Sequence, residues 1–190
     1  MKRLLLILIL TFSFQTLTKA DDIRDFQLEG MSLGDSLLDF YTEKEIRKNL
    51  KNYYNDKDYL AAEFDPKNLD YSNIQVHFKN DDEKFPIYAL DGLFLIKNMK
   101  QCIDKKNDIA NKMSSIFNNA KREDRPDAKM ASGHGVMPNI KFLFTTGDFA
   151  EVTCYDYNER VENEKGWTDH GRVSIVNKKL DEWIINKAHK

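Results

Sequence analysis

The run Ile140-Lys-Phe-Leu-Phe-Thr-Thr-Gly-Asp-Phe-Ala-Glu-Val-Thr-Cys-Tyr-Asp-Tyr157 contains two stretches rich in β-branched and aromatic residues. They are joined by Gly147-Asp148, a pair typical of a two-residue hairpin turn that has glycine first. Side chains alternate along a strand, so Ala150, Val152 and Cys154 share one face of the second stretch. The run predicts an antiparallel hairpin with Cys154 directed into the core.

A long amphipathic helix is predicted upstream of this hairpin. From Met99 to Ala120, apolar residues return to one face of a 3.6-residue period, and Cys102 belongs to that stripe. Asn98, followed three residues later by Gln101, resembles a capping box and predicts that the helix begins there. Cys102 is therefore expected in the first turns, on the buried side.

The rest of the chain predicts further strands and shorter helices. Strands are expected over 26–29, 59–64, 73–78, 86–96 and 170–177, with Asp91-Gly92 marking a tight turn or a bulge. Short helices are expected over 35–41, from Thr42 onward, and at the C-terminus around Leu180 and Trp183, with polar segments over 121–139 and 158–169. This order predicts one α+β domain over 21–190, in which a mainly antiparallel sheet carries the long and the C-terminal helix on one face.

The first twenty residues have the pattern of a secretory signal peptide. Lys2 and Arg3 precede an apolar run, and Thr18-Lys19-Ala20 offers small residues for cleavage. The alternative is an uncleaved N-terminal anchor, although the apolar run is shorter than the roughly 20 residues that a span needs. We expect a periplasmic or secreted protein with no membrane span after cleavage.

The charge balance disfavours nucleic acid as a partner. Loss of Lys2, Arg3 and Lys19 with the signal leaves 26 cations of 29 against 31 acids, so the net charge changes from −2 to −5. A mildly acidic domain has no electrostatic attraction for phosphate backbones. The expected partner is an envelope protein or a small ligand.

Two cysteines, Cys102 and Cys154, remain in the mature chain. An even count in an oxidising compartment predicts a disulfide, which would attach the long helix to the sheet. The alternative is two separate buried thiols, since free cysteine packs readily as a small apolar residue. Two cysteines without CxxC spacing or nearby histidines do not suggest a metal site, and we expect no metal or cofactor.

Gly34-Asp35-Ser36-Leu37 matches the nucleophile block of the GDSL esterases and lipases. The resemblance implies a hydrolase with Ser36 as nucleophile, activated by the histidine of an Asp-x-x-His pair. Ile74, Ala131, Trp167 and Asn186 stand three residues before the four histidines, so that pair is missing. The alternative explanation is that Gly34 allows a turn and Asp35 or Ser36 caps a short helix.

A second resemblance extends over nearly the whole mature chain. The run Asp25-Phe-Gln-Leu-Glu-Gly-Met-Ser-Leu-Gly-Asp-Ser-Leu-Leu-Asp-Phe-Tyr41, Cys102 in the long helix, Cys154 after a Gly-Asp turn and Trp183 near the end are similar to an uncharacterised family of exported proteins from Pelagibacter-like marine alphaproteobacteria. The resemblance implies no catalytic residues. It supports the paired cysteines and the periplasmic location.

Several side chains are candidates for ligand binding. His134 lies in Ser132-Gly133-His134-Gly135, where a glycine-rich binding loop competes with an exposed loop tip. Trp167 and His170 could border a pocket or simply precede a strand. Tyr53, Tyr54 and Tyr59 could line a groove, although aromatic residues beside strands usually pack in the core. The sequence favours an exported binding or interaction domain without catalytic residues, with the serine hydrolase at Ser36 as the alternative.

Overall fold

The computed structural model describes residues 22–67, 70–130 and 133–190. Its strands are β1 (Leu50–Lys51), β2 (Tyr59–Phe64), β3 (Asn73–Lys79), β4 (Ile87–Leu95), β5 (Lys121–Arg125), β6 (Gly135–Val136), β7 (Asn139–Leu143), β8 (Phe149–Tyr157) and β9 (His170–Val176). Its helices are η1 (Ile23–Asp25), η2 (Leu37–Asp39), α1 (Glu43–Lys48), α2 (Met99–Ile116), α3 (Glu159–Lys165) and α4 (Lys178–Asn186), where η marks a 3₁₀ helix.

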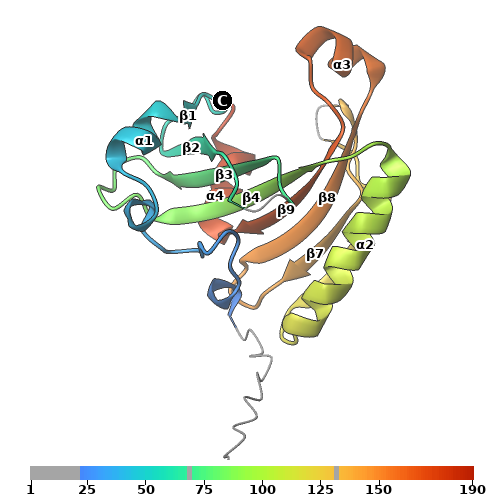
Figure 1. Ribbon diagram of the computed structural model, residues 1–190, viewed down its shortest axis with the longest axis horizontal. Helices are drawn as coiled ribbons and strands as arrows, with labels where there is room; N and C mark the ends of the chain where they lie inside the picture. Colours follow the sequence, from blue (N-terminus) through green and yellow to red (C-terminus); the bar gives the residue numbers. More distant parts are fainter. Residues whose placement is uncertain (1–21, 68–69, 131–132) are drawn as a thin grey trace, which may run out of the picture.

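One curved antiparallel sheet connects both halves of the chain (Figure 1). Its strand order is β1-β2-β3-β4-β9-β8-β7-β5, and β6 pairs with β8. The N-terminal strands meet the C-terminal strands where β4 pairs with β9, at the middle of the sheet. The predicted α+β class with a mainly antiparallel sheet is confirmed.

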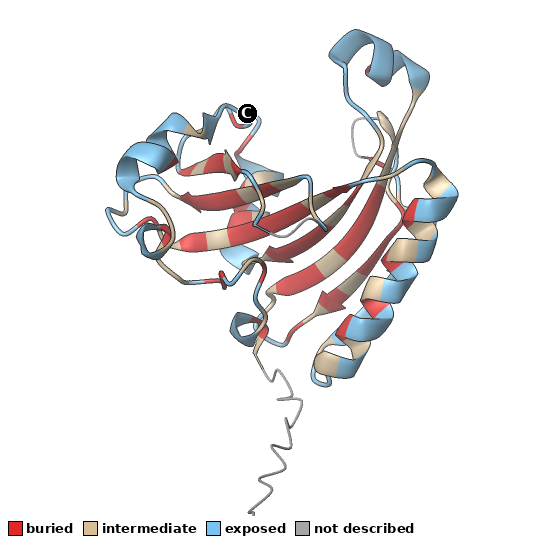
Figure 2. Ribbon diagram, in the orientation of Figure 1, coloured by how far each residue is buried: buried red, intermediate tan, exposed pale blue. Residues whose placement is uncertain are grey.

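The first face of the sheet carries the larger core. Val76, Leu90 and Val152 are fully buried there, and the neighbouring strands contribute similar apolar side chains. Helix α2 covers this face over β7 and β8, and the segment from Ile23 to Ile46 covers the remainder (Figure 1). Figure 2 shows the result as buried central strands and an α2 that is buried only on its inner side.

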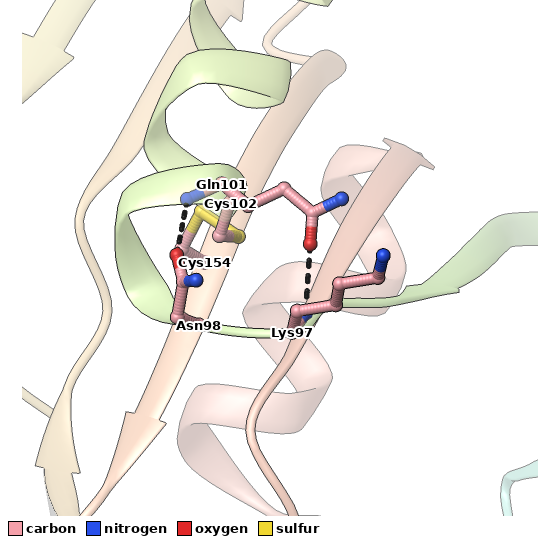
Figure 3. The surroundings of a disulfide bond; sticks show 5 residues. All are labelled: Lys97, Asn98, Gln101, Cys102 and Cys154. Atoms are coloured by element: carbon pink, nitrogen blue, oxygen red, sulfur yellow. Dashed lines mark hydrogen bonds between the residues drawn. A yellow bond between two sulfur atoms is a disulfide. The ribbon is translucent and has the colours of Figure 1, made fainter.

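The predicted link between the long helix and the hairpin is confirmed. The sulfurs of Cys102 in α2 and Cys154 in β8 are bonded at 2.05 Å, and both residues are fully buried (Figure 3). Asn98 caps α2 as expected, because its side chain accepts from the Gln101 amide at 2.9 Å. The reciprocal bond differs from a capping box, since the Gln101 side chain accepts from the Lys97 amide and not from Asn98 (Figure 3).

The prediction that both helices cover one face is wrong. Leu180 and Trp183 of α4 pack against Tyr59, Ala61 and Ala89, which belong to a second core cluster. These strand residues alternate with those of the first core, so they point to the opposite face. Strand β2 has buried apolar residues on both faces, with Tyr59 and Ala61 on one side and Ala62 and Phe64 on the other, and such a strand requires a covering layer on each side.

The structure also differs from the sequence-based predictions at several turns and connections. The hairpin loop has three residues and not two, because the Phe144 amide donates to the Asp148 carbonyl and Gly147 takes the left-handed conformation at φ 89°. Asp91-Gly92 lies inside an unbroken β4, and the irregularity falls instead between His77 and Phe78 of β3. The polar segment after α2 contains the charged edge strand β5.

The N-terminal segment is less regular than expected. In place of a strand over 26–29, a tight turn at Glu29-Gly30 leaves one bridge between Leu28 and Met31. The helix over 35–41 shortens to η2, and the helix after Thr42 is confirmed with its capping box to Glu45.

The predicted signal peptide, 1–20, lies outside the described residues. Over 22–67, 70–130 and 133–190, none of the helices combines the length and the apolar character that crossing a bilayer requires.

Candidate functional site: an aromatic cleft

Polar side chains form a row across the second face of the sheet, beside the area that α4 covers. Gln75 of β3 lies opposite Asp91 of β4, and Asp91 lies opposite Ser174 of β9. His77 and Arg172 lie two residues from members of this row and therefore share its face. Antiparallel pairing in register thus collects polar groups that are far apart in the sequence.

Asp91 is the centre of a buried hydrogen-bond network. Its Oδ2 lies 3.0 Å from His77 Nε2, and its Oδ1 accepts from the Ser174 hydroxyl. The other ring nitrogen of His77, Nδ1, lies 2.8 Å from the Tyr54 hydroxyl. Arg172 Nε stands 3.8 Å from Asp91 Oδ1, which is an ion-pair distance and too long for a hydrogen bond.

The network determines the charge of the buried carboxyl group. Burial by itself would raise the pKa of Asp91, but the positive charge of Arg172 and hydrogen bonds from His77 and Ser174 lower that pKa to about 2. Asp91 is therefore ionised at neutral pH. Burial raises the pKa of Tyr54, and the nearby negative charge of Asp91 raises it further, so this phenol stays protonated.

Aromatic rings surround the exposed side of this network and form a cleft of about 500 Å³. We define the aromatic cleft by its lining side chains: Tyr53, Tyr54, Gln75, His77, Leu93, Tyr155, Tyr157, Trp167, Thr168, His170 and Arg172. Tyr155 stacks on His170 with ring centroids 4.7 Å apart, and Trp167 meets Tyr157 edge-on at 5.3 Å. The volume lies within the range of small-ligand sites.

The segment between β8 and β9, which contains α3, forms the exposed wall of the cleft. Asn158 caps α3, and Gly166 ends it in the left-handed conformation at φ 67°. Trp167 follows immediately and remains 42% exposed. The Asp169 side chain accepts a hydrogen bond from the Tyr157 amide at 2.9 Å, and this bond joins the two ends of the segment. Figure 1 shows α3 at the far end of the β8 and β9 ribbons.

The opposite wall depends on the C-terminal helix. Tyr54 packs edge-on against Trp183 of α4 with centroids 4.8 Å apart. The carbonyl of Ala188 accepts from the Asn55 amide at 2.8 Å, and Asp56 accepts from the Trp183 indole at 3.1 Å. Residues 53–56 are thus held against α4, and this contact places Tyr54 over His77.

The structure brings together most of the predicted ligand-binding residues. Trp167 and His170 line the aromatic cleft, and the ring of His134 lies 5.5 Å from that of Trp167. Tyr53 and Tyr54 also line it. Tyr59 instead packs with Trp183 in the second core, and Ser132 lies outside the described residues.

Ser36 has the environment of a capping residue. Its hydroxyl donates to the Lys84 carbonyl at 2.6 Å and accepts from the Leu38 amide at 3.3 Å, at the start of η2. These hydrogen bonds engage the serine proton with a backbone carbonyl, whereas a serine nucleophile needs a basic partner.

Sequence reasoning missed the floor of the cleft: His77, Asp91, Ser174 and Arg172. Each lies on the face of its strand opposite the first core, and polar residues at such positions normally face solvent. The available signal was Asp91 within the apolar run 86–96, because a carboxylate in a buried strand needs partners. The identity of those partners depends on strand register.

No cluster of three or more His, Cys, Asp or Glu suited to a metal ion occurs over the described ranges. The chain matches no family model, no curated protein and no solved structure.

Proposed function

We propose that the protein is an exported, periplasmic binding domain whose aromatic cleft holds a small ligand that contains a six-membered ring. The observation that carries the proposal is the convergence of Tyr53, Tyr155, Tyr157, Trp167 and His170 from three separate parts of the chain on one cleft. Aromatic faces with a few fixed polar groups between them are typical of small-ligand sites.

The hydrogen bonding of His77 favours binding over catalysis. In a carboxylate–histidine–hydroxyl triad, the histidine takes the proton of an accessible nucleophile that it contacts. Here Nε2 faces Asp91 at 3.0 Å and Nδ1 faces the hydroxyl of Tyr54 at 2.8 Å, but Tyr54 is buried and burial raises the pKa of its phenol. His77 therefore contacts a phenol that keeps its proton, and the network serves to fix the shape of the cleft floor.

Export is supported by the N-terminal signal pattern and by the Cys102–Cys154 bond, since disulfides persist in oxidising compartments. The resemblance to a family of exported proteins points in the same direction. In this location the domain would meet small molecules that have crossed the outer envelope.

The test is a ligand titration that uses Trp167 as the reporter. A panel of aromatic acids, aromatic amides, sugars and sugar acids is added to purified protein, and intrinsic fluorescence and calorimetry are followed. We expect saturable binding for at least one class and loss of its fluorescence signal in Trp167→Phe. Ile185→Ala, on the exposed side of α4, is the control and should bind as the wild type does. Absence of saturable binding across the panel at millimolar concentration would contradict the proposal.

A further inference from the structure

The polar groups of the aromatic cleft differ in whether their hydrogen bonds are already made. Gln75 donates to Glu63 at 3.0 Å, and the Tyr53 hydroxyl also bonds to Glu63. His77 and Tyr54 bond to each other. These side chains satisfy one another's hydrogen bonds and leave few donors or acceptors for a ligand.

Arg172 is different, because most of its donors are unused. A guanidinium carries five N–H donors, and within the described part of the chain one hydrogen bond is made, from Nη2 to the Tyr155 hydroxyl. Its Nε is buried and has no hydrogen-bond partner among the described residues. The side chain lines the cleft and is 26% exposed. Arg172 therefore presents donors and a positive charge to whatever occupies the cleft.

Tyr155 adds a second donor at the same position. Its oxygen accepts from Arg172, so its own proton is free to point elsewhere. The Arg172 guanidinium lies over the Tyr155 ring, 4.6 Å from the centroid, and His170 stacks on the same ring. This packing holds the guanidinium and the phenol hydroxyl side by side, which suits an acceptor with two oxygens.

The negative charge of Asp91 beneath the site limits the negative charge that a bound ligand can carry. Asp91 is fully engaged by His77 and Ser174 and stands 3.8 Å from Arg172 Nε. Glu151, which lies opposite Ser174 on the same face, also interacts with Arg172, so this guanidinium already faces two carboxyl groups. A dianionic phosphate would add repulsion from Asp91, whereas a single carboxylate adds less and matches the planar donors.

We propose that the ligand is a six-membered ring carrying one carboxylate, with the carboxylate bound by Arg172 and the Tyr155 hydroxyl and the ring packed against Tyr157 and Trp167. This inference rests on the proposed binding function and names the chemical class that the cleft selects. An aromatic acid and a sugar acid share that chemistry, and the experiment distinguishes them.

The experiment compares matched probes by calorimetry at one pH and salt concentration. Benzoate is compared with benzamide, galacturonate with galactose, and benzoate with phenyl phosphate. Because hydrogen bonds to a charged group are stronger than neutral ones, we expect the acid of one pair to bind about tenfold or more tighter than its neutral partner. The pair that shows this difference identifies the ring type.

Variants connect the preference to the two side chains. Arg172→Gln should reduce the acid's affinity to about that of the neutral partner, so that the ratio of the two affinities falls to about one. Because Arg172→Gln also removes the counter-charge of buried Asp91, Tyr155→Phe provides a second test that changes no charge. It keeps the ring and should weaken acid binding by several-fold.

The outcomes separate the two proposals. If neutral rings bind as tightly as acids, or phenyl phosphate binds more tightly than benzoate, the carboxylate inference is overturned and the binding function stands. If Tyr155→Phe and Arg172→Gln fold and both retain the wild-type preference, the assignment to these residues is overturned. If none of these probes binds, the carboxylate inference fails, and the binding function fails with it when no other member of the panel binds.

Discussion

Asp91 fixes the floor of the aromatic cleft through the side chains that surround it. It accepts hydrogen bonds from His77 and Ser174 and faces Arg172, and it is 5% exposed. A buried charge of this kind is tolerated only when it is paired and hydrogen-bonded. The geometry of the cleft and the ionisation of Asp91 are therefore linked.

The first prediction concerns stability in acid. The pKa of Asp91 is lowered from 3.8 to about 2 in the folded protein. A group with a depressed folded pKa stabilises the fold above its unfolded pKa, and that stability is lost as pH falls toward the folded value. We expect Asp91 to contribute on the order of 2 kcal/mol, lost between about pH 4 and pH 2. Urea unfolding measured across that range checks it.

Two variants isolate this effect. Asp91→Asn should be less stable than the wild type at pH 6, because Arg172 loses its buried partner, and its stability should depend less on pH below 4. Asp65→Asn, at an exposed carboxylate, should reproduce the wild-type dependence. An Asp91→Asn protein with an unchanged acid dependence would show that other carboxylates dominate.

The second prediction separates capping from catalysis at Ser36. Ser36→Ala should lower the free energy of unfolding by about 1 kcal/mol, because η2 loses its cap and Lys84 its hydroxyl partner. Ser36→Thr, which keeps a hydroxyl, should lose less. Ligand binding in the cleft should be unchanged in both variants, and a fluorophosphonate probe should not label the wild type. Labelling that disappears in Ser36→Ala would favour the hydrolase.

For single residues, the sequence predicts the aromatic side chains of the cleft better than its buried polar ones. Trp167, His170, Tyr53 and Tyr54 were recognisable because an aromatic residue beside turns or strand ends requires an explanation. Asp91 and Arg172 were not recognisable as partners, since 81 residues separate them. Only the pairing of β4 with β9 brings them together.

The disulfide acts between elements, because it joins the first turns of α2 to β8 across 52 residues of sequence. In the chain-entropy model a closed loop of this length contributes roughly 4 kcal/mol, and measured values often fall below it. We expect reduction to lower the urea midpoint without changing the fold. The Cys102→Ala/Cys154→Ala double variant should show the reduced midpoint and no response to reductant. A midpoint that reduction leaves unchanged would contradict this role.

Gly166 controls the wall of the cleft through the end of α3. Its φ of 67° is a conformation that residues other than glycine and asparagine adopt with difficulty, and an added Cβ would meet nothing within 4 Å. Gly166→Ala should therefore introduce backbone strain of about 1 kcal/mol and displace Trp167, weakening ligand binding. Gly166→Asn is the matched control, because asparagine tolerates this conformation. Equal binding by both variants and the wild type, measured by calorimetry, would show that Trp167 is placed by other contacts.

The elements themselves were largely predictable, and their arrangement less so. The strand over 59–64 and the long helix after Asn98 have strong periodicity and clear boundaries. The face that α4 covers was not predictable, because Ala61 and Ala89 are small and their apolar character is easily attributed to the first core. Two-sided burial of β2 and β4 becomes evident only when the sheet is assembled.

For the whole molecule, the division of the second face explains where a binding site can exist. The first face is closed by α2 and the N-terminal segment. On the second face α4 covers the part around Tyr59 and Ala89, while β8 and β9 extend toward α3 (Figure 1). The aromatic cleft lies between α4 and the segment that contains α3. The same strands that complete the core therefore also supply walls of the cleft.

The last prediction concerns where the whole chain matures. When the full chain is expressed in a Gram-negative host, we expect periplasmic protein that begins at Asp21 and carries the Cys102–Cys154 bond, since only an oxidising compartment maintains it. Intact-mass measurement before and after alkylation checks both features. Leu8→Arg interrupts the apolar run of the signal and is the control: its product should stay in the cytoplasm, uncleaved and with two free thiols. Without the bond, the mature sequence should unfold at lower urea, because α2 is then held to the sheet by packing alone. A wild-type chain that stays uncleaved in the cytoplasm would contradict export and leave the disulfide without the compartment that maintains it.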